Sequence, residues 1–465
     1  MVFSSMFFLF LFLMATIAVY FLVPQRQRRM RNLVLLGASL FFYFFGEPLG
    51  ILLMLASIVG NYCFARGAAA GRRARLWLTV SVVFNLLLLG TFKYADFFVA
   101  NLNALTGLSL PQPGLAMPIG ISFFTFQGMS YVFDVYARRV PAQRSILNVA
   151  AYISMFPQLV AGPIVRYETV AAELDCRRET LSRAAEGARR FIYGLSKKML
   201  LSNAMGKIAA AVFAENPAGL AAPVAWVGAL AYTFQIFFDF SGYSDMAIGL
   251  GHIFGFTFPE NFNYPYISRS ITEFWRRWHM SLGAWFRDYV YIPLGGSRRG
   301  RTRQLVNILI VWTLTGLWHG AAWNFVVWGL YFALLLILEK LFLLRALERA
   351  PRIAGHIYTL VLVVLGWVLF NSSSLSHAAG YLAALFRAPD TARDVGQAVY
   401  YLHQYLPEWL CCVLFSLPAG PWLRRKCEAR VWYAPAVTAA AAVLFLLSLL
   451  SVVSSSFNPF IYFRF

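Results

Sequence analysis

One stretch decides the fold class of this chain: residues 304–338, QLVNILIVWTLTGLWHGAAWNFVVWGLYFALLLIL. It contains no Lys, Arg, Asp or Glu, and its only histidine is His319. A helix that crosses the hydrocarbon core of a bilayer needs about 20 mainly apolar residues. The stretch therefore predicts membrane-spanning helices on either side of His319, at residues 304–322 and 324–344.

Composition extends this interpretation to the whole chain. Of its 465 residues, 60% are hydrophobic and 13% are charged, and the mean hydropathy is +0.62. Soluble domains carry about 25% charged residues. We expect an all-α polytopic membrane protein with about eleven transmembrane helices. The other apolar segments are residues 3–23, 33–46, 50–65, 76–92, 94–116 (with a turn-rich outer loop), 117–136, 146–165, 191–212, 222–254, 353–370, 396–419 and 432–455.

Some segments do not fit a simple crossing. Residues 146–165 are interrupted by Pro157 and by a Gly-Pro pair, which predicts a broken or re-entrant segment that protein or a cavity must cover. Residues 166–190 are polar and helix-prone, which predicts an interfacial helix at the cytoplasmic surface. Residues 255–303 are too polar and too aromatic for an ordinary span.

The charge balance fits a membrane protein as well. Lys and Arg outnumber Asp and Glu by 40 to 20, and they gather in short loops between apolar segments, as cytoplasmic loops do under the positive-inside rule. The first such loop, residues 24–32, predicts an extracytoplasmic N-terminus and a first transmembrane helix before it. No folded basic domain is visible, so the expected surroundings are a lipid bilayer and nucleic acid is not an expected partner.

Two histidines lie in aromatic-rich stretches, His319 in WTLTGLWHGAAWNFVVWGLY (residues 312–331) and His279 in FWRRWHMSLGAWFRDYVYIPLGG (residues 274–296). A neutral imidazole can take a proton from a hydroxyl and return it, because its ordinary pKa is near 6.5. An ionisable residue inside a membrane is a functional candidate by default. The alternatives are a structural histidine bonded to its own helix for His319 and an interfacial residue for His279.

The charged residues near these stretches have two interpretations. The arginines could hold the phosphates of a nucleotide-derived donor such as coenzyme A, or they could only fix topology, which is the favoured interpretation. Asp239 and Asp245 are expected to be buried in FDFSGYSDMAIG and to pair with arginines such as Arg287, holding the site in shape. Asp288 is given the same structural role. The arginines concerned are Arg276, Arg277, Arg287, Arg298, Arg299, Arg301 and Arg303.

Other catalytic signatures are missing from the sequence. There is no G-x-x-x-x-G-K-[ST] loop, so ATP-driven transport has no support, and there is no G-x-S-x-G elbow. No H-E-x-x-H pair occurs, and the five cysteines form no zinc or disulfide pattern. We therefore expect no metal site and no bound cofactor.

Together with other segments, the two histidine stretches resemble the membrane-bound O-acyltransferase (MBOAT) family, and more narrowly its bacterial branch of alginate O-acetylation proteins with their peptidoglycan and cellulose counterparts. The resemblance implies a single transmembrane domain over residues 1–465, with a motif core at 118–331 and helices in a ring around a thinned core. The other segments are MVFSSMFFLFLFL (1–13), PIGISFFTFQGMSYVFDVY (118–136), MFPQLVAGPIVRYE (155–168), FDFSGYSDMAIGLG (238–251), PENFNYPYISRSITEFW (259–275) and FNPFIYFRF (457–465).

The resemblance also implies an enzyme that moves an acetyl group from a cytoplasmic thioester donor, acetyl-CoA, across the inner membrane to acetylate alginate or another exported or cell-wall polysaccharide. His319 falls on the family's general base and His279 on its second position. Trp278 would orient substrate or stabilise an oxyanion, while Trp318 and Asn324 would support the site. The implied partner is an extracytoplasmic, serine-dependent (SGNH-like) acetyltransferase that acts on the polysaccharide acceptor.

Three alternatives stay open. The acyl group could come from an acyl carrier protein, as in D-alanylation, and copurification of a phosphopantetheine carrier would favour that. The chain could be a transporter or channel without acyl chemistry. It could also be a scaffold of a polymer-export complex, in which case function would survive replacement of both histidines.

Overall fold

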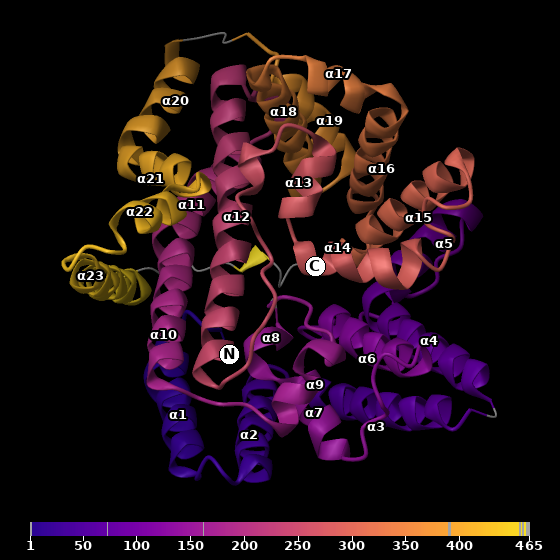
Figure 1. Cartoon of the computed structure of the whole chain (residues 1–465). Helices are drawn as coiled ribbons and strands as arrows, with labels where there is room; N and C mark the ends of the chain where they lie inside the picture. The colour runs from indigo at the N-terminus through magenta and orange to yellow at the C-terminus, as the bar shows by residue number, and fades with distance from the viewer. Residues whose placement is uncertain are drawn as a thin grey trace. The chain divides into compact units, whose positions relative to one another are not determined.

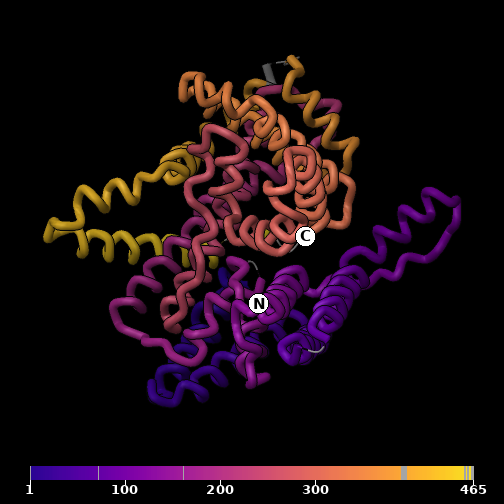
Figure 2. Tube along the Cα trace, turned by 45° about the vertical axis from the view of Figure 1, so that its right-hand side comes forward, coloured from indigo at the N-terminus to yellow at the C-terminus, as the bar shows by residue number. Residues whose placement is uncertain are grey.

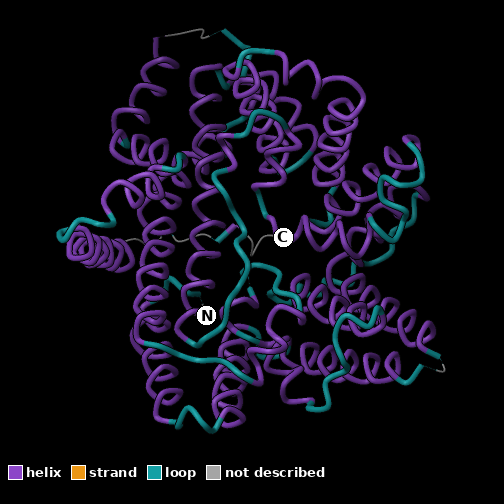
Figure 3. The backbone as a smooth tube through the Cα atoms, in the orientation of Figure 1, coloured by secondary structure: helices purple, strands orange, loops and turns teal. Residues whose placement is uncertain are grey.

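The computed structural model describes residues 2–71, 73–160, 162–388, 392–454, 457, 460 and 461. These residues form helices, turns and loops and contain no strand (Figure 3). The chain divides into two compact units. Unit 1 comprises Met1–Phe191 and Ser244–Pro259, and unit 2 comprises Ile192–Tyr243 and Glu260–Phe465. The predicted all-α class is confirmed.

Six helices within the described residues are long and apolar enough to cross a membrane. The polytopic class is therefore confirmed, while the predicted count of about eleven crossings stays a prediction. The six are Gly50–Ala69, Ala74–Thr106, Ala222–Ile253, Trp323–Arg349, Arg352–Asn371 and Tyr433–Ser454.

Unit 1 is built around α6 (Ile121–Tyr136), most of whose side chains are buried and which packs against α3 and α4. The helix formed by α4 and α5 reaches away from the rest of this unit through α5 (Figure 2). The other elements of the unit are η1 (Phe7–Phe12), α1 (Leu13–Leu22), α2 (Arg28–Gly46), α3 (Gly50–Ala69), α4 (Ala74–Leu89), η2 (Gly90–Tyr94), α5 (Ala95–Thr106), α7 (Ile146–Ser154), α8 (Phe156–Leu159) and α9 (Tyr167–Asp175).

Two predicted boundaries in unit 1 can be compared with the structure. The break within residues 146–165 is confirmed, because α7 ends at Ser154 and α8 is a single turn that has Pro157 among its first residues. The separation of residues 76–92 from 94–116 is wrong. A π-helical segment, η2, joins α4 to α5 without a break, and the helix ends only where Gly107 adopts a left-handed backbone.

The prediction that residues 166–190 form one interfacial helix is also wrong. The segment contains α9 and then the first turns of α10 (Leu181–Ser196), which continues through η3 (Lys197–Ser202) into α11 (Asn203–Phe213). No proline interrupts residues 181–213, so the polar residues at its start belong to one long helix.

Unit 2 holds both histidine stretches on α13 to α16 (Figure 1). The predicted single span at 396–419 is wrong, because the helix breaks at Tyr405, just before a proline in the first turn of α21. The elements are η4 (Pro217–Gly219), α12 (Ala222–Ile253, shared with unit 1), η5 (Pro265–Ile267), α13 (Ile271–Arg277), α14 (Met280–Phe286), η6 (Arg287–Tyr291), α15 (Arg301–His319), α16 (Trp323–Leu338), η7 (Glu339–Leu343), α17 (Leu344–Arg349), α18 (Arg352–Asn371), α19 (Leu375–Ala384), α20 (Ala392–Gln404), α21 (Leu406–Ser416), α22 (Ala419–Cys427) and α23 (Tyr433–Ser454).

π-helical turns recur at charged positions along otherwise regular helices. Five such segments occur in the described residues, and four of them carry charged side chains. A π turn contains one residue more than an α turn and is frequent at functional sites. The four are η2 with Lys93, η3 with Lys197 and Lys198, η6 with Arg287 and Asp288, and η7 with Glu339 and Lys340.

Candidate active site

His319 is the last residue of α15, enclosed by aromatic rings. Its side chain is 4% exposed, and its ring centroid lies 5.1 Å from that of Trp328 and 5.2 Å from that of Phe370. Close packing of α15 on α16 sets this position. A Cβ atom at Gly316 would collide with the backbone oxygen of Phe325, and small residues of this kind let two membrane helices approach closely.

His279 lies between α13 and α14 in a left-handed backbone conformation, with φ 45° and ψ 51°. The loop before α13 holds this junction through two backbone hydrogen bonds, from Met280 N to Asn261 O at 3.0 Å and from Asn263 N to Arg277 O at 2.9 Å. The conformation is costly for a residue with a side chain, so these bonds stabilise a strained corner. The imidazole is 2% exposed.

The two histidines are 40 positions apart in the sequence, and the ring of Trp318 connects them. Its centroid lies 6.0 Å from that of His279 and 5.0 Å from that of His319. The ring of Phe240, on α12, packs at a right angle to the His279 ring, with the two centroids 4.6 Å apart. The fold thus places both histidines against Trp318, while the roles expected of these residues stay predictions.

The hydrogen bonds of Asn261 define the tautomer of His279. Oδ1 of Asn261 accepts from the backbone N of Ser281 at 3.2 Å and from its Oγ at 2.9 Å, which identifies this atom as the oxygen. Nδ1 of His279 lies 3.2 Å from the same oxygen and so must donate. In a neutral ring the other nitrogen, Nε2, is then the acceptor. His279 lies outside the six candidate spans, and burial lowers its pKa to about 3, so the ring is neutral near pH 7.

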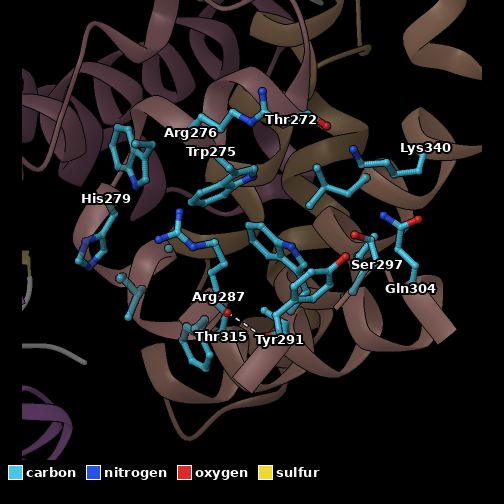
Figure 4. Close-up of a pocket in the computed structure, with 18 residues that line it drawn as sticks. Thr272, Trp275, Arg276, His279, Arg287, Tyr291, Ser297, Gln304, Thr315 and Lys340 are labelled. Atoms are coloured by element: carbon cyan, nitrogen blue, oxygen red, sulfur yellow. Dashed lines mark hydrogen bonds between the residues drawn. The ribbon is translucent and has the colours of Figure 1, made fainter. Parts of the chain in front are cut away.

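A cavity of about 410 Å³ opens beside His279. In Figure 4, His279 lies at one end and Lys340 at the other. The described residues that line it include Thr315, one helical turn before His319, but not His319 itself. Its walls carry tryptophans, three cationic side chains and several hydroxyl or amide groups: Trp275, Trp278 and Trp312; Arg276, Arg287 and Lys340; and Thr272, Ser297, Gln304 and Thr315.

The other predicted site residues are distributed unevenly. Trp278 is 3% exposed, lines the cavity and packs 4.8 Å from Trp367. Asn324 donates from Nδ2 to Ser372 O at 2.9 Å, which ties α16 to the end of α18. Arg277 pairs with Glu273 at 2.9 Å. Arg298 and Arg299 are not among the described residues that line the cavity.

The predicted partners of the buried aspartates are wrong. Asp239 pairs with Lys198 at 2.6 Å, and its Oδ2 accepts from Ile461 N at 2.9 Å. Asp245 pairs with Arg190 at 2.9 Å. Arg287 instead pairs with its neighbour Asp288, through contacts of 2.6 and 3.0 Å. Burial correctly indicated that the aspartates need cations, but a cation on a neighbouring helix is closer than the arginines around His279.

Sequence reasoning missed several residues of this site, among them Asn261, Thr315 and Lys340. The sequence does indicate Lys340 as a candidate, because it follows Glu339, the first charged residue after the uncharged run 304–338. Asn261 lies in PENFNYPY, a segment noted only for its resemblance. Across the residues that the structure describes, no three His, Cys, Asp or Glu side chains gather as a metal site would require.

These features define a class of protein: a polytopic membrane protein with two buried histidines, one of which lines a cavity walled by tryptophans. The model of the membrane-bound O-acyltransferase family matches residues 73–373. The chain belongs to this family and is a multi-pass membrane enzyme, an O-acyltransferase. The expected domain limits, 1–465 with a core at 118–331, stay a prediction, and most of the segment 457–465 lies outside the described residues.

Curated relatives agree with this assignment. The chain is 40% identical to "Probable alginate O-acetylase AlgI" of Azotobacter vinelandii, with all of both chains covered. It is 34% identical to the peptidoglycan O-acetyltransferase of Helicobacter pylori, over 81% of this chain and 78% of the relative. It is 28% identical to the teichoic acid D-alanyltransferase of Bacillus subtilis, over 58% of this chain and 74% of the relative.

Proposed function

We propose that the chain is an O-acetyltransferase of the bacterial inner membrane, with an extracytoplasmic N-terminus, that moves an acetyl group from acetyl-CoA toward an exported or cell-wall polysaccharide. The relatives support acetyl as the transferred group. Those named for O-acetylation match 81% or more of this chain in the comparisons above, whereas the D-alanyltransferase matches 58%.

The cavity beside His279 carries this proposal. An acetyl-CoA donor has anionic phosphates at one end and an uncharged pantetheine arm that ends in the thioester. Arg276, Arg287 and Lys340 supply cations for the phosphates, and the tryptophans offer apolar walls for the arm. The volume of about 410 Å³ lies within the usual range for small-molecule sites, about 300–1,000 Å³. The thioester would then lie near His279.

His319 acts as the general base. It takes the proton of an acceptor hydroxyl as that oxygen attacks the thioester carbonyl. The new C–O bond forms, the C–S bond breaks, and the proton passes on to the thiolate of the leaving coenzyme A.

His279 orients the acceptor and does not stabilise the oxyanion. Its Nδ1 proton is engaged by Asn261, so the neutral ring can offer only a lone pair on Nε2. This suits a second hydroxyl of the acceptor, other than the attacking hydroxyl whose proton goes to His319, and does not suit a negatively charged oxygen. The oxyanion therefore needs a different donor, and the indole N–H of Trp278 is the candidate that the sequence resemblance names.

The acetyl group is then handed to an extracytoplasmic serine-dependent acetyltransferase, which modifies the polysaccharide. A carrier-bound acyl group is the alternative donor. Its phosphopantetheine arm has the same uncharged chain and thioester, so the tryptophan walls would suit it equally, whereas three cations fit the larger phosphate charge of free acetyl-CoA better.

The test is transfer of radiolabelled acetyl from acetyl-CoA to the polymer fraction, in membranes matched for protein level. His319→Ala is expected to lower the label by at least about 100-fold, while His403→Ala, which changes an exposed histidine on α20, should leave it unchanged. Equal label with His319→Ala would remove His319 from the mechanism. No label with the wild-type chain would contradict acetyl-CoA as the donor.

A further inference from the structure

Glu339 is a buried carboxylate in an apolar setting. It is the first charged residue after the uncharged run 304–338, it begins η7, and it is 1% exposed. A buried carboxylate is costly unless hydrogen bonds satisfy it. Oε1 accepts from Ile271 N at 2.6 Å, and Oε2 accepts from Thr272 N at 2.8 Å and from Thr272 Oγ1 at 2.6 Å.

These donors belong to the first turn of α13. The first N–H groups of a helix have no partner within it, and α13 obtains its partners from two side chains. Ser270 accepts from Glu273 N at 3.0 Å, and Glu339, from another helix, accepts from the two residues before Glu273. A negative charge at this end of a helix is also favoured by the backbone dipoles.

The position of α13 matters because its other end forms the cavity. Trp275 and Arg276 lie in its last turn and line the cavity, and Trp278 and His279 follow directly. Thr272, which Glu339 binds through both backbone and hydroxyl, lines it as well, and so does Lys340. One π turn of η7 therefore directs Glu339 toward α13 and Lys340 toward the cavity.

We propose that Glu339 is a positioning residue for the acyl donor. Its carboxylate fixes α13 so that Trp275, Trp278 and His279 keep the geometry that the donor requires. This inference rests on the proposed function of the cavity as the donor site. It predicts that loss of the carboxylate weakens use of the donor and not only the stability of the fold.

The experiment measures steady-state acetyl transfer from acetyl-CoA to the acceptor by the full chain, in membranes that contain both. Glu339→Gln keeps the volume but turns an NH₂ group toward N–H donors. It is expected to raise the KM for acetyl-CoA by about tenfold or more, because hydrogen bonds to charged groups are lost. Thr272→Val removes one of the three bonds and should raise the KM less, and Thr272→Ser should restore it. Glu348→Gln, an exposed glutamate on α17, is the matched control.

A simple brace would behave differently from a positioning residue. It would lower the melting temperature and the fraction of active protein while leaving the KM unchanged. An unchanged KM in both Glu339→Gln and Thr272→Val would therefore overturn the inference and leave the proposed function standing. If the wild-type chain transfers no acetyl group from acetyl-CoA, the proposed function fails, and the positioning role fails with it. Hydrogen exchange of residues 271–279 then reports whether Glu339 still anchors α13, since Glu339→Gln should speed exchange there and not in α18.

Discussion

Asn261 determines which nitrogen of His279 carries the proton. The amide oxygen accepts from the backbone and hydroxyl of Ser281 and lies 3.2 Å from Nδ1 of His279. The contact spans 18 positions in the sequence and connects the loop before α13 to the corner after it. A histidine held in this way has a defined acceptor nitrogen before any substrate arrives, and this preorganisation is what an acceptor-orienting group needs.

Replacement of that amide tests the tautomer. Asn261→Ala removes the acceptor at Nδ1, so the proton is free to move to Nε2, and we expect the turnover of acetyl-CoA to fall by roughly tenfold, the effect of one lost buried hydrogen bond. Ser281→Ala removes only the Ser281 hydroxyl from the same oxygen and should cost much less. Equal losses in the two variants would mean that Asn261 supports the loop and not the histidine.

The left-handed corner at His279 separates a backbone role from a side-chain role. Asn tolerates this conformation better than most residues, so His279→Asn should keep the melting temperature and lose at least about tenfold in acetyl transfer. His279→Val places a β-branched residue there and should destabilise the fold by about 1–3 kcal/mol. A stable, fully active His279→Asn protein would show that the imidazole is dispensable.

The ion pair of Lys198 and Asp239 should dominate the stability of its surroundings. Both side chains are buried, at 3% and 1% exposure, and removal of one partner strands the other charge. Asp239→Asn is expected to lower the free energy of unfolding by about 3–5 kcal/mol. The double change Lys198→Met with Asp239→Leu should recover much of that loss, although not the bond from Ile461 N. Thermal unfolding in detergent measures both, and an unperturbed Asp239→Asn would contradict the pairing.

Glu179 should make unit 1 sensitive to acid. It lies between α9 and α10, outside the candidate spans. Burial alone would raise the pKa of its carboxyl, but hydrogen bonds from Arg28 and Tyr20 outweigh this effect and hold the pKa at about 2. The folded pKa lies below the ordinary value of 4.5, so its stabilisation is complete above that value and is lost as the pH falls toward 2.

The corresponding measurement is the melting temperature between pH 6 and pH 3. The wild-type protein should lose stability as the pH falls through this window. Glu179→Gln should start lower and change less, because it has no carboxyl to protonate. Glu168→Gln, whose carboxylate lies 3.8 Å from Arg166 and is 38% exposed, should follow the wild-type curve. If Glu179→Gln and the wild type lose stability in parallel, another group causes the acid sensitivity.

The sequence predicted the helical class and both histidines because these depend on local signals. An uncharged run of this length has few interpretations other than membrane-spanning helices, and a histidine among tryptophans stands out within it. The partner of Asp239 could not be predicted in the same way. A buried carboxylate requires a cation nearby. Which cation pairs with it depends on the direction in which η3 points Lys198, and that direction is set by packing.

The role of Glu339 was hidden for a related reason. A cap that comes from the same helix produces a recognisable spacing in the sequence, such as Ser270 three residues before Glu273. A cap that comes from another helix, 67 or 68 positions away, produces no such spacing. Likewise, nothing in residues 90–94 indicates that a π turn carries α4 through into α5, so the sequence predicts two separate segments there.

The π turns change the residue spacing of the helices that contain them. Each holds one residue more than a regular turn, so deletion of a single residue there would restore an ordinary α-helix and leave the residues beyond the turn on their faces. In η3 such a deletion would displace Lys198, and in η7 it would change the directions of Glu339 and Lys340. Single-residue deletions at these points should therefore disturb the ion pair of Lys198 and the cap formed by Glu339, while the helix turns that follow stay in place.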